Sequence, residues 1–230
     1  MKTFIIGDIH GCDQALRRLL EKLQPQEETD RLILLGDLFD RGPESWEVFQ
    51  TVKRLAGIYG RRFALLRGNH EEYLLSPRLT FFQRRIWDRV GRGATAASFK
   101  AHGERMEDAA PWIGETCQLF YRDEQIQCVH AGLMIDPLEA NDAYTLIHDH
   151  EAVFRNRYTG RLTVVGHIAL DAPTWFAGDG ETVQTLPYDQ WKPLPETGVL
   201  CIDTGCGKGG RLTAMIIEEG NYLLETVEEK

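Results

Sequence analysis

The sequence predicts an α/β (α+β) fold, with a parallel sheet in its N-terminal third and a second, mostly antiparallel sheet in its C-terminal third. In the first 70 residues, short apolar segments alternate with helical ones, which is the pattern of a βαβαβ unit. In the last third, short strand-like segments alternate with turns such as Glu219-Gly220-Asn221. A length of 230 residues suits a single domain covering residues 1–230.

The N-terminal strands are expected at residues 2–6, 31–35 and 63–66, where continuous apolar runs indicate burial on both faces of a sheet. Helices should lie between these strands, and Pro43 suits the first turn of the second helix. The buried faces of the two helices are predicted from apolar residues at helical spacing: Leu16, Leu19, Leu20 and Leu23, then Trp46, Phe49, Val52 and Leu55.

Residues 77–111 have a charged helical pattern, which predicts a cap-like helical insertion. Further strands are expected at residues 125–129, 162–165, 182–186, 198–202, 212–217 and 222–226.

Composition restricts the partners and the compartment. The chain has 35 acidic and 26 basic residues, a net charge of -9, which argues against nucleic acid as a default partner. Because the apolar run at residues 4–6 is too short for a signal segment and no later run is long enough to span a membrane, we expect neither secretion nor membrane insertion. The five cysteines are scattered and odd in number, as expected for reduced thiols in a cytoplasmic protein. The oligomeric state is not predicted.

Polar motifs follow five of the predicted strands. Because ligands of α/β sheets bind at the carboxyl ends of strands, we expect these distant motifs to meet. In order, they are Gly7-Asp8-Ile9-His10-Gly11, Gly36-Asp37-Leu38-Phe39-Asp40-Arg41-Gly42, Gly68-Asn69-His70-Glu71, Val129-His130-Ala131-Gly132 and Val165-Gly166-His167.

The motifs supply a set of oxygen and imidazole ligands that contains no thiolate. The candidates are Asp8, His10, Asp37, Asn69, His130 and His167. Such ligands favour borderline to hard divalent ions, with manganese as the leading candidate and iron, zinc, cobalt or nickel as alternatives. Six ligands exceed the need of one tetrahedral ion, whereas two ions that share a carboxylate would use them all.

A pair of divalent ions suits the hydrolysis of phosphate esters. Two ions about 3.5–4 Å apart can generate a bridging hydroxide and neutralise the charge that develops on phosphorus. The leaving alkoxide needs a proton, which a histidine beside a carboxylate can donate. An arginine can bind the remaining phosphate oxygens through its planar guanidinium.

The motif set resembles that of calcineurin-like metallophosphoesterases. The Asp40-Arg41-Gly42 extension narrows the resemblance to the phosphoprotein-phosphatase family, which includes bacterial and phage serine/threonine protein phosphatases and symmetrical diadenosine-tetraphosphate hydrolases. The resemblance spans residues 2–75 and 125–217, includes the segment from Ile202 to Thr213, and is weak in the cap. It implies a central sandwich of mixed β-sheets flanked by helices.

The resemblance also implies a role for each site residue. Asp8 and His10 would bind the first metal ion, Asp37 would bridge, and the second ion would be bound by Asn69, His130 and His167. His70 would be the general acid, paired with Asp40, and Arg41 would contact the phosphate.

One segment departs from the family pattern. Relatives commonly carry a tryptophan and a phosphate-binding arginine upstream of the last metal-binding histidine, where this chain has Leu146-Ile147-His148-Asp149-His150-Glu151. Four alternatives stay open: Arg155 or Arg157 replaces that arginine, the site has no second arginine, His148 and His150 face the substrate, or the segment is a solvated helix.

The leading functional hypothesis is a serine/threonine protein phosphatase, with a phosphorylated protein as substrate. The alternatives are hydrolysis of a dinucleoside polyphosphate or another small nucleotide at the same site, and a non-catalytic metal-binding module. Residues 205–210 match the glycine spacing of a dinucleotide-binding loop, but they precede a strand rather than a helix, so that function is not expected.

Overall fold

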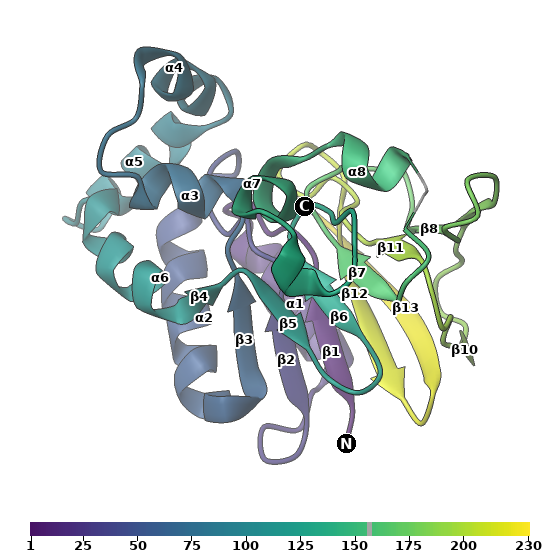
Figure 1. Ribbon diagram of the computed structural model, residues 1–230. Helices are drawn as coiled ribbons and strands as arrows, with labels where there is room; N and C mark the ends of the chain where they lie inside the picture. The colour runs from purple at the N-terminus through teal and green to yellow at the C-terminus, as the bar shows by residue number, and fades with distance from the viewer. Residues whose placement is uncertain (156–157) are drawn as a thin grey trace.

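The computed structural model describes residues 1–155 and 158–230, which form two β-sheets packed face to face between layers of helices (Figure 1). Within these residues, the first sheet has seven strands in the order β10-β13-β12-β1-β2-β3-β4, and the second has six in the order β5-β6-β7-β11-β8-β9. The predicted fold class, a sandwich of mixed sheets flanked by helices, is confirmed.

The elements have the following bounds. The strands are β1 (Thr3–Ile6), β2 (Arg31–Leu34), β3 (Phe63–Leu66), β4 (Cys117–Gln118), β5 (Phe120–Arg122), β6 (Gln127–Val129), β7 (Thr163–Val165), β8 (Thr174–Phe176), β9 (Val183–Thr185), β10 (Lys192–Pro193), β11 (Val199–Cys201), β12 (Arg211–Glu218) and β13 (Asn221–Glu228). The helices are α1 (Asp13–Leu23), α2 (Ser45–Tyr59), α3 (Asn69–Leu75), α4 (Phe81–Arg89), α5 (Arg92–Ala101), α6 (Ala110–Thr116), α7 (Ala143–His148) and α8 (Glu151–Phe154), with short 3-10 helices η1 (Gly60–Arg62), η2 (Met106–Ala109) and η3 (Leu138–Ala140).

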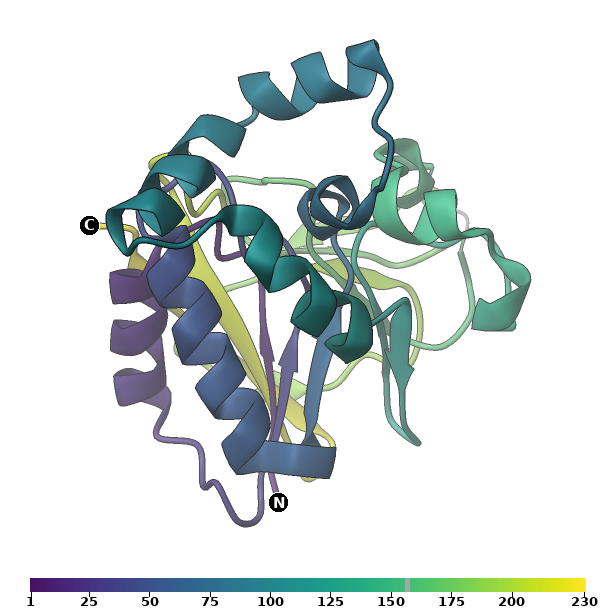
Figure 2. The same cartoon turned by 90° about the vertical axis from the view of Figure 1, so that its left-hand side faces the viewer.

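The apolar strands of the first sheet are buried on both faces, as their sequences predict. Strands β1, β2 and β3 are parallel neighbours, and alternate side chains enter different cores. Phe4 and Ile6 pack with the helical layer that contains α1 and α2, whereas Ile5 packs with residues of the second sheet. Figure 2 shows α1 and α2 side by side on the outer face of this sheet. A third apolar cluster joins the other sheet to α7 and α8.

The C-terminal third differs from its prediction. Its two longest strands, β12 and β13, do not belong to a separate sheet but extend the first one, where β12 pairs antiparallel with β1. In the second sheet three of the five strand pairings are antiparallel, as expected, but β7 lies parallel to both β6 and β11, so the sheet is mixed. Short strands separated by turns predict pairing between strands that are adjacent in the sequence. Pairing between strands that are distant in the sequence depends on the tertiary fold.

Helix positions agree with the sequence pattern apart from local differences. Helix α2 begins at Ser45, so Pro43 precedes the helix instead of lying in its first turn. The stretch predicted as an insertion contains α4, α5 and η2, and it projects beyond the end of the sheets at which the polar motifs lie (Figure 1). Its status as an insertion into one domain stays a prediction. Within the described residues, no helix combines the length and apolar character needed to cross a membrane.

Candidate metal centre

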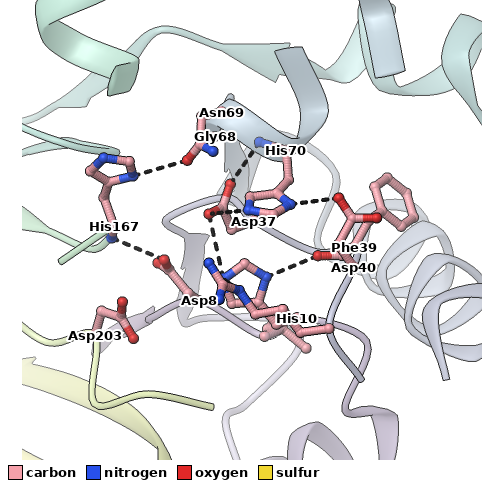
Figure 3. A network of polar contacts seen from close by, with 12 residues as sticks. Asp8, His10, Asp37, Phe39, Asp40, Gly68, Asn69, His70, His167 and Asp203 are labelled. Atoms are coloured by element: carbon pink, nitrogen blue, oxygen red, sulfur yellow. Dashed lines mark hydrogen bonds and ion pairs between the residues drawn. The ribbon is translucent and has the colours of Figure 1, made fainter. Parts of the chain in front are cut away.

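The five polar motifs lie together at the carboxyl ends of strands from both sheets. Asp8 follows β1, Asp37 follows β2, and Asn69 begins α3 just after β3. His130 directly follows β6 and His167 follows β7, both in the second sheet. Figure 3 shows the side chains of several of these segments converging on one small volume. The packing of the two sheets therefore brings together residues that are up to 159 positions apart.

Asp37 lies at the centre of this cluster. Its Oδ1 is 3.4 Å from His130 Nε2, and its Oδ2 is 3.5 Å from His10 Nε2 and 3.8 Å from His70 Nε2. Potential ligand atoms of His10, Asp37 and His70 lie within 4.8 Å of one another, and so do those of Asp37, His130 and His167. The two groups share Asp37, as a carboxylate between two ions would require.

Asn69 and Asp8 complete the cluster on the side of the second sheet. Asn69 Oδ1 is 2.9 Å from His167 Nδ1 and 3.3 Å from His130 Nε2. The backbone N–H of His167 donates to Asp8 Oδ2 at 2.9 Å, which links β7 to β1. Asp8 is not in either of the two compact ligand groups, but it is buried beside them and its other oxygen, Oδ1, has no hydrogen-bond partner within the described residues.

Backbone carbonyls orient two of the histidines. His10 Nδ1 lies 2.9 Å from the carbonyl oxygen of Phe39, and His130 Nδ1 lies 2.8 Å from that of Leu35. A carbonyl only accepts, so each Nδ1 carries the proton and donates it. Each Nε2, the nitrogen that faces Asp37, is therefore the one that would bind a metal ion once it is deprotonated, and a fixed Nδ1 prepares an imidazole for that role.

Two glycines of the motifs lie so close to carboxylates of the cluster that no side chain fits there. A Cβ at Gly68 would lie 2.1 Å from Asp37 Oδ1, and a Cβ at Gly166 would lie 2.1 Å from Asp8 Oδ1. Any larger residue would displace a carboxylate of the cluster. The backbone of the site is also unusual, because five of the eight non-glycine residues with positive φ among those described belong to it: His10, Asp37, Asp40, Arg41 and His167. Such conformations are costly and often occur at functional sites.

The electrostatics of the cluster favour a bound cation. Burial, together with the charge of Asp203, raises the pKa of Asp8 well above its usual value. Burial and the charge of His130 lower the pKa of His167 to about 2, so its imidazole is neutral and able to ligate. Buried and unpartnered oxygens remain on Asp8 and Asp203 within the described residues. Buried carboxylates of this kind are usually paired with charge or bind metals, so the donor set fits divalent ions.

His70 belongs to a second, connected network. Its Nδ1 is 2.5 Å from Asp40 Oδ2, and its Nε2 faces Asp37. Asp40 is fully buried and also accepts hydrogen bonds from Trp87 Nε1 at 2.7 Å and Thr95 Oγ1 at 2.6 Å. Burial opposes protonation of His70, but the charge of Asp37 and the hydrogen bond to Asp40 raise its pKa above the usual value. Asp37 and Asp40 therefore favour the protonated form of this imidazole at the edge of the metal cluster.

Arg41 contacts a histidine of the cluster, whereas Arg155 does not reach the cluster. Arg41 Nε donates to His10 Nε2 at 3.1 Å. Arg155 is exposed, and its Nη2 forms an ion pair with Glu151 at 2.9 Å. Arg157 lies outside the described residues.

His150 approaches the cluster more closely than its sequence context suggests. Its Nδ1 is 3.3 Å from His167 Nε2, and the two ring centres are 4.1 Å apart. His148 instead faces Tyr73 and stacks with Tyr144, beside a cavity of about 240 Å³. His148 is half-buried and His150 is exposed, so both side chains remain accessible to solvent beside the cluster.

Four residues without a role in the sequence analysis contribute to the site: Glu71, Trp87, Thr95 and Asp203. Glu71 is buried and accepts the backbone N–H groups of Asp37, Leu38 and Gly68 at 2.7–3.0 Å, which joins the loops after β2 and β3. Asp203 follows strand β11, so the strand-end rule could have identified it. Trp87 and Thr95 lie on α4 and α5, and no pattern in the sequence relates these helices to Asp40.

Comparison with known proteins agrees with this geometry. A family model described as calcineurin-like phosphoesterase matches residues 1–197. Two relatives, from Pasteurella multocida and Erwinia tasmaniensis, are both named symmetrical bis(5'-nucleosyl)-tetraphosphatase. They are 28% and 27% identical to this chain, and the alignments cover 96% and 98% of it and 96% and 97% of the relatives.

Solved structures show a similar fold. A metallophosphoesterase from Sphaerobacter thermophilus has a TM-score of 0.66 at 17% identity, and the match covers all of this chain and 90% of the other. A protein serine/threonine phosphatase from Saccharomyces cerevisiae has a TM-score of 0.63 at 15% identity, covering 99% of this chain and 80% of the other. Likeness at these identities concerns the fold and does not distinguish between substrates.

Proposed function

This chain belongs to the calcineurin-like phosphoesterase family, and on that basis we propose that it hydrolyses dinucleoside polyphosphates at a pair of divalent metal ions. The observation that carries the substrate class is the match, over nearly the whole chain, to relatives named for that activity. The protein phosphatase favoured by the sequence alone has weaker support, since that name occurs on a structural neighbour of 15% identity.

We assign the metal ligands residue by residue. Asp8 and His10 serve the first ion, Asp37 serves both, and the second ion takes the remaining three: Asn69, His130 and His167. The central position of Asp37 and the Nε2 atoms of His10 and His130 that face it support this assignment. The mixed oxygen and imidazole set suits manganese, which is the ion we propose.

The side chains around the ions have separate tasks in the proposed reaction. When bound, the two ions supply an activated water nucleophile and offset the charge that develops on phosphorus. Arg41 at the edge of the cluster binds a phosphate oxygen and orients the group for attack. His70 donates a proton from Nε2 to the departing phosphate oxygen.

Asp40 is a positioning residue for this proton transfer. Its carboxylate accepts a hydrogen bond from Nδ1–H of His70. This bond fixes the ring orientation and directs the other ring nitrogen, Nε2, toward the reacting groups. Trp87 and Thr95 hold Asp40 in turn. Among the candidates for a second phosphate contact, we propose His150 because it touches His167, whereas Arg155 is engaged in a surface ion pair.

The test compares two substrates on manganese-loaded protein. We expect diadenosine tetraphosphate to yield two molecules of ADP, measured by ion-exchange chromatography, and EDTA to abolish the reaction. A phosphoserine peptide should react with a much lower kcat/KM. The opposite preference would establish the protein phosphatase instead, and metal binding without turnover of either substrate would support a non-catalytic module.

A further inference from the structure

A glycine-rich loop with one lysine packs directly against the metal centre. The loop, residues 205–210, connects the Asp203 segment to strand β12. A Cβ at Gly207 would lie 2.6 Å from the Cβ of His10 and 3.1 Å from that of Arg41. Only a glycine permits this approach, and Lys208 is the residue that follows it in the loop.

The loop is held in one conformation by its own backbone. Lys208 N and Gly210 N both donate to the carbonyl of Gly205, at 2.9 and 3.0 Å, and Arg211 N donates to that of Thr204. The side chain of Cys206 is buried, with its Sγ 3.4 Å from the carbonyl of Ile9. A rigid loop of this kind can present a charge without a large entropic cost on ligand binding.

Lys208 is a cation available to a ligand. Its side chain is exposed, and among residues 1–155 and 158–230 its ammonium has no hydrogen bond or ion pair. Neighbouring Arg211, in contrast, is paired with Glu228 at 2.8 Å. The charge of Lys208 reaches the metal centre electrostatically: burial raises the pKa of Asp203, while the Gly205 amide and Lys208 act in the opposite direction.

A cavity of about 500 Å³ lies next to this lysine. One wall is formed by residues 169–171, which follow His167, and another by Thr204 and Gly205, which follow Asp203. Lys208 and the glycines after it also line the cavity. The loop already receives one carboxylate, since Gly209 N donates to Glu229 Oε2 at 2.6 Å. The lining also contains the carboxylates of Asp171 and Glu228, and Glu228 is paired with Arg211, so Lys208 is the cation that the cavity offers to an anion.

We propose that Lys208 and its glycine-rich loop form a subsite for a phosphate group adjacent to the one attacked at the metal centre. A phosphomonoester has a single phosphate, which the ions and Arg41 can neutralise. A polyphosphate chain carries further charges, and on a protein with a net charge of -9 they require a local cation. This subsite rests on the proposed function, because it applies to substrates with two or more linked phosphates.

Binding of ADP and AMP to the manganese-loaded protein, measured by isothermal titration calorimetry, tests the subsite without any need for turnover. The two nucleotides differ by one phosphate. We expect Lys208→Gln to weaken ADP binding about fivefold, the scale of one exposed charge contact, and to change AMP binding less than twofold. Lys208→Arg should keep ADP binding within about twofold of wild type, because it retains the charge.

A matched control is Lys100→Gln, at an exposed lysine near the end of α5, which should leave both nucleotides unaffected. Equal weakening of ADP and AMP by Lys208→Gln, or no weakening of either, would overturn the subsite. Hydrolysis of diadenosine tetraphosphate by the wild-type protein tests the proposed function separately. A protein that binds ADP through Lys208 but does not cleave this substrate would refute the function and retain the subsite.

Discussion

The hydrogen bond from Trp87 to Asp40 gives the sharpest test of how the helical segment supports the site. Trp87→Phe removes the indole N–H that donates to Asp40 Oδ2 at 2.7 Å while it keeps an aromatic ring at a position that is 5% exposed. A hydrogen bond to a charged, buried group contributes about 1.5–3 kcal/mol. The smaller ring leaves a cavity that costs roughly 1 kcal/mol more.

The expected loss in the free energy of unfolding is therefore about 2–4 kcal/mol. At roughly 2–4 °C per kcal/mol for a chain of this size, Tm should fall by about 5–15 °C in a calorimetric scan. Asp40 retains His70 and Thr95 as donors, so the site should persist with a less well-held carboxylate. We expect the variant to lose about 1.4 kcal/mol of transition-state stabilisation, which lowers kcat roughly tenfold.

Trp46→Phe is the matched control. Its indole nitrogen is buried without a hydrogen-bond partner in the described part of the chain, and its ring stacks on His102 with a centroid distance of 3.7 Å, a contact that phenylalanine can keep. We expect this variant to lose about 1 kcal/mol or less and to keep the wild-type kcat. If both variants lose the same stability and both retain full kcat, the bond from Trp87 does not hold Asp40 for catalysis.

Three further outcomes test the metal centre and the proton donor. His70→Asn should keep two metal ions per protein and lower kcat by roughly 10²–10⁴, the scale of general acid catalysis; unchanged kcat would remove His70 from that role. Asp37→Asn should reduce the metal content measured by elemental analysis, since both ligand groups share this carboxylate, and a normal stoichiometry of two would contradict the bridging assignment. Burial lowers the pKa of His130, but the charges of Asp37 and Asp8 raise it to about 10 in the metal-free protein. Manganese must displace that proton, so its affinity should fall as the pH decreases, and about one proton should be released on binding at pH 7. The release is measured by titration calorimetry in buffers of different ionisation enthalpy, and a binding enthalpy that does not depend on the buffer would contradict it.

The local elements and the candidate ligands could be predicted because their physical causes are local. Leu16 and Leu19 recur at helical spacing, and the apolar residues 32–34 of β2 require burial on both faces, as observed. A single polar turn after a strand, such as that of Asp8 or Asp37, is common, but five such motifs at strand ends in one chain indicate a binding site. The same logic applied to Asp203 would have added it to the site.

Long-range pairing was beyond the sequence because it depends on how distant segments share one core. Strand β12 joins β1 across more than 200 positions, in a register that places Ile217 opposite Thr3. The apolar residues of α4 and α5 likewise indicate which face of each helix is buried. They do not indicate that Trp87 and Thr95 form hydrogen bonds with Asp40. Hydrogen bonds between such segments exist only after the chain has folded.

The sequence by itself determined the kind of chemistry: carboxylates, imidazoles and an amide at strand ends, in a set suited to divalent ions. Only the tertiary structure decided that Asp37 lies between two histidine groups, that Asp40 is held by two helices, and that Gly207 packs against His10 and Arg41. The reason is physical. Residue type and spacing set what a side chain can bind and which local element it joins, whereas distances between side chains far apart in the chain follow from the packing of the two sheets.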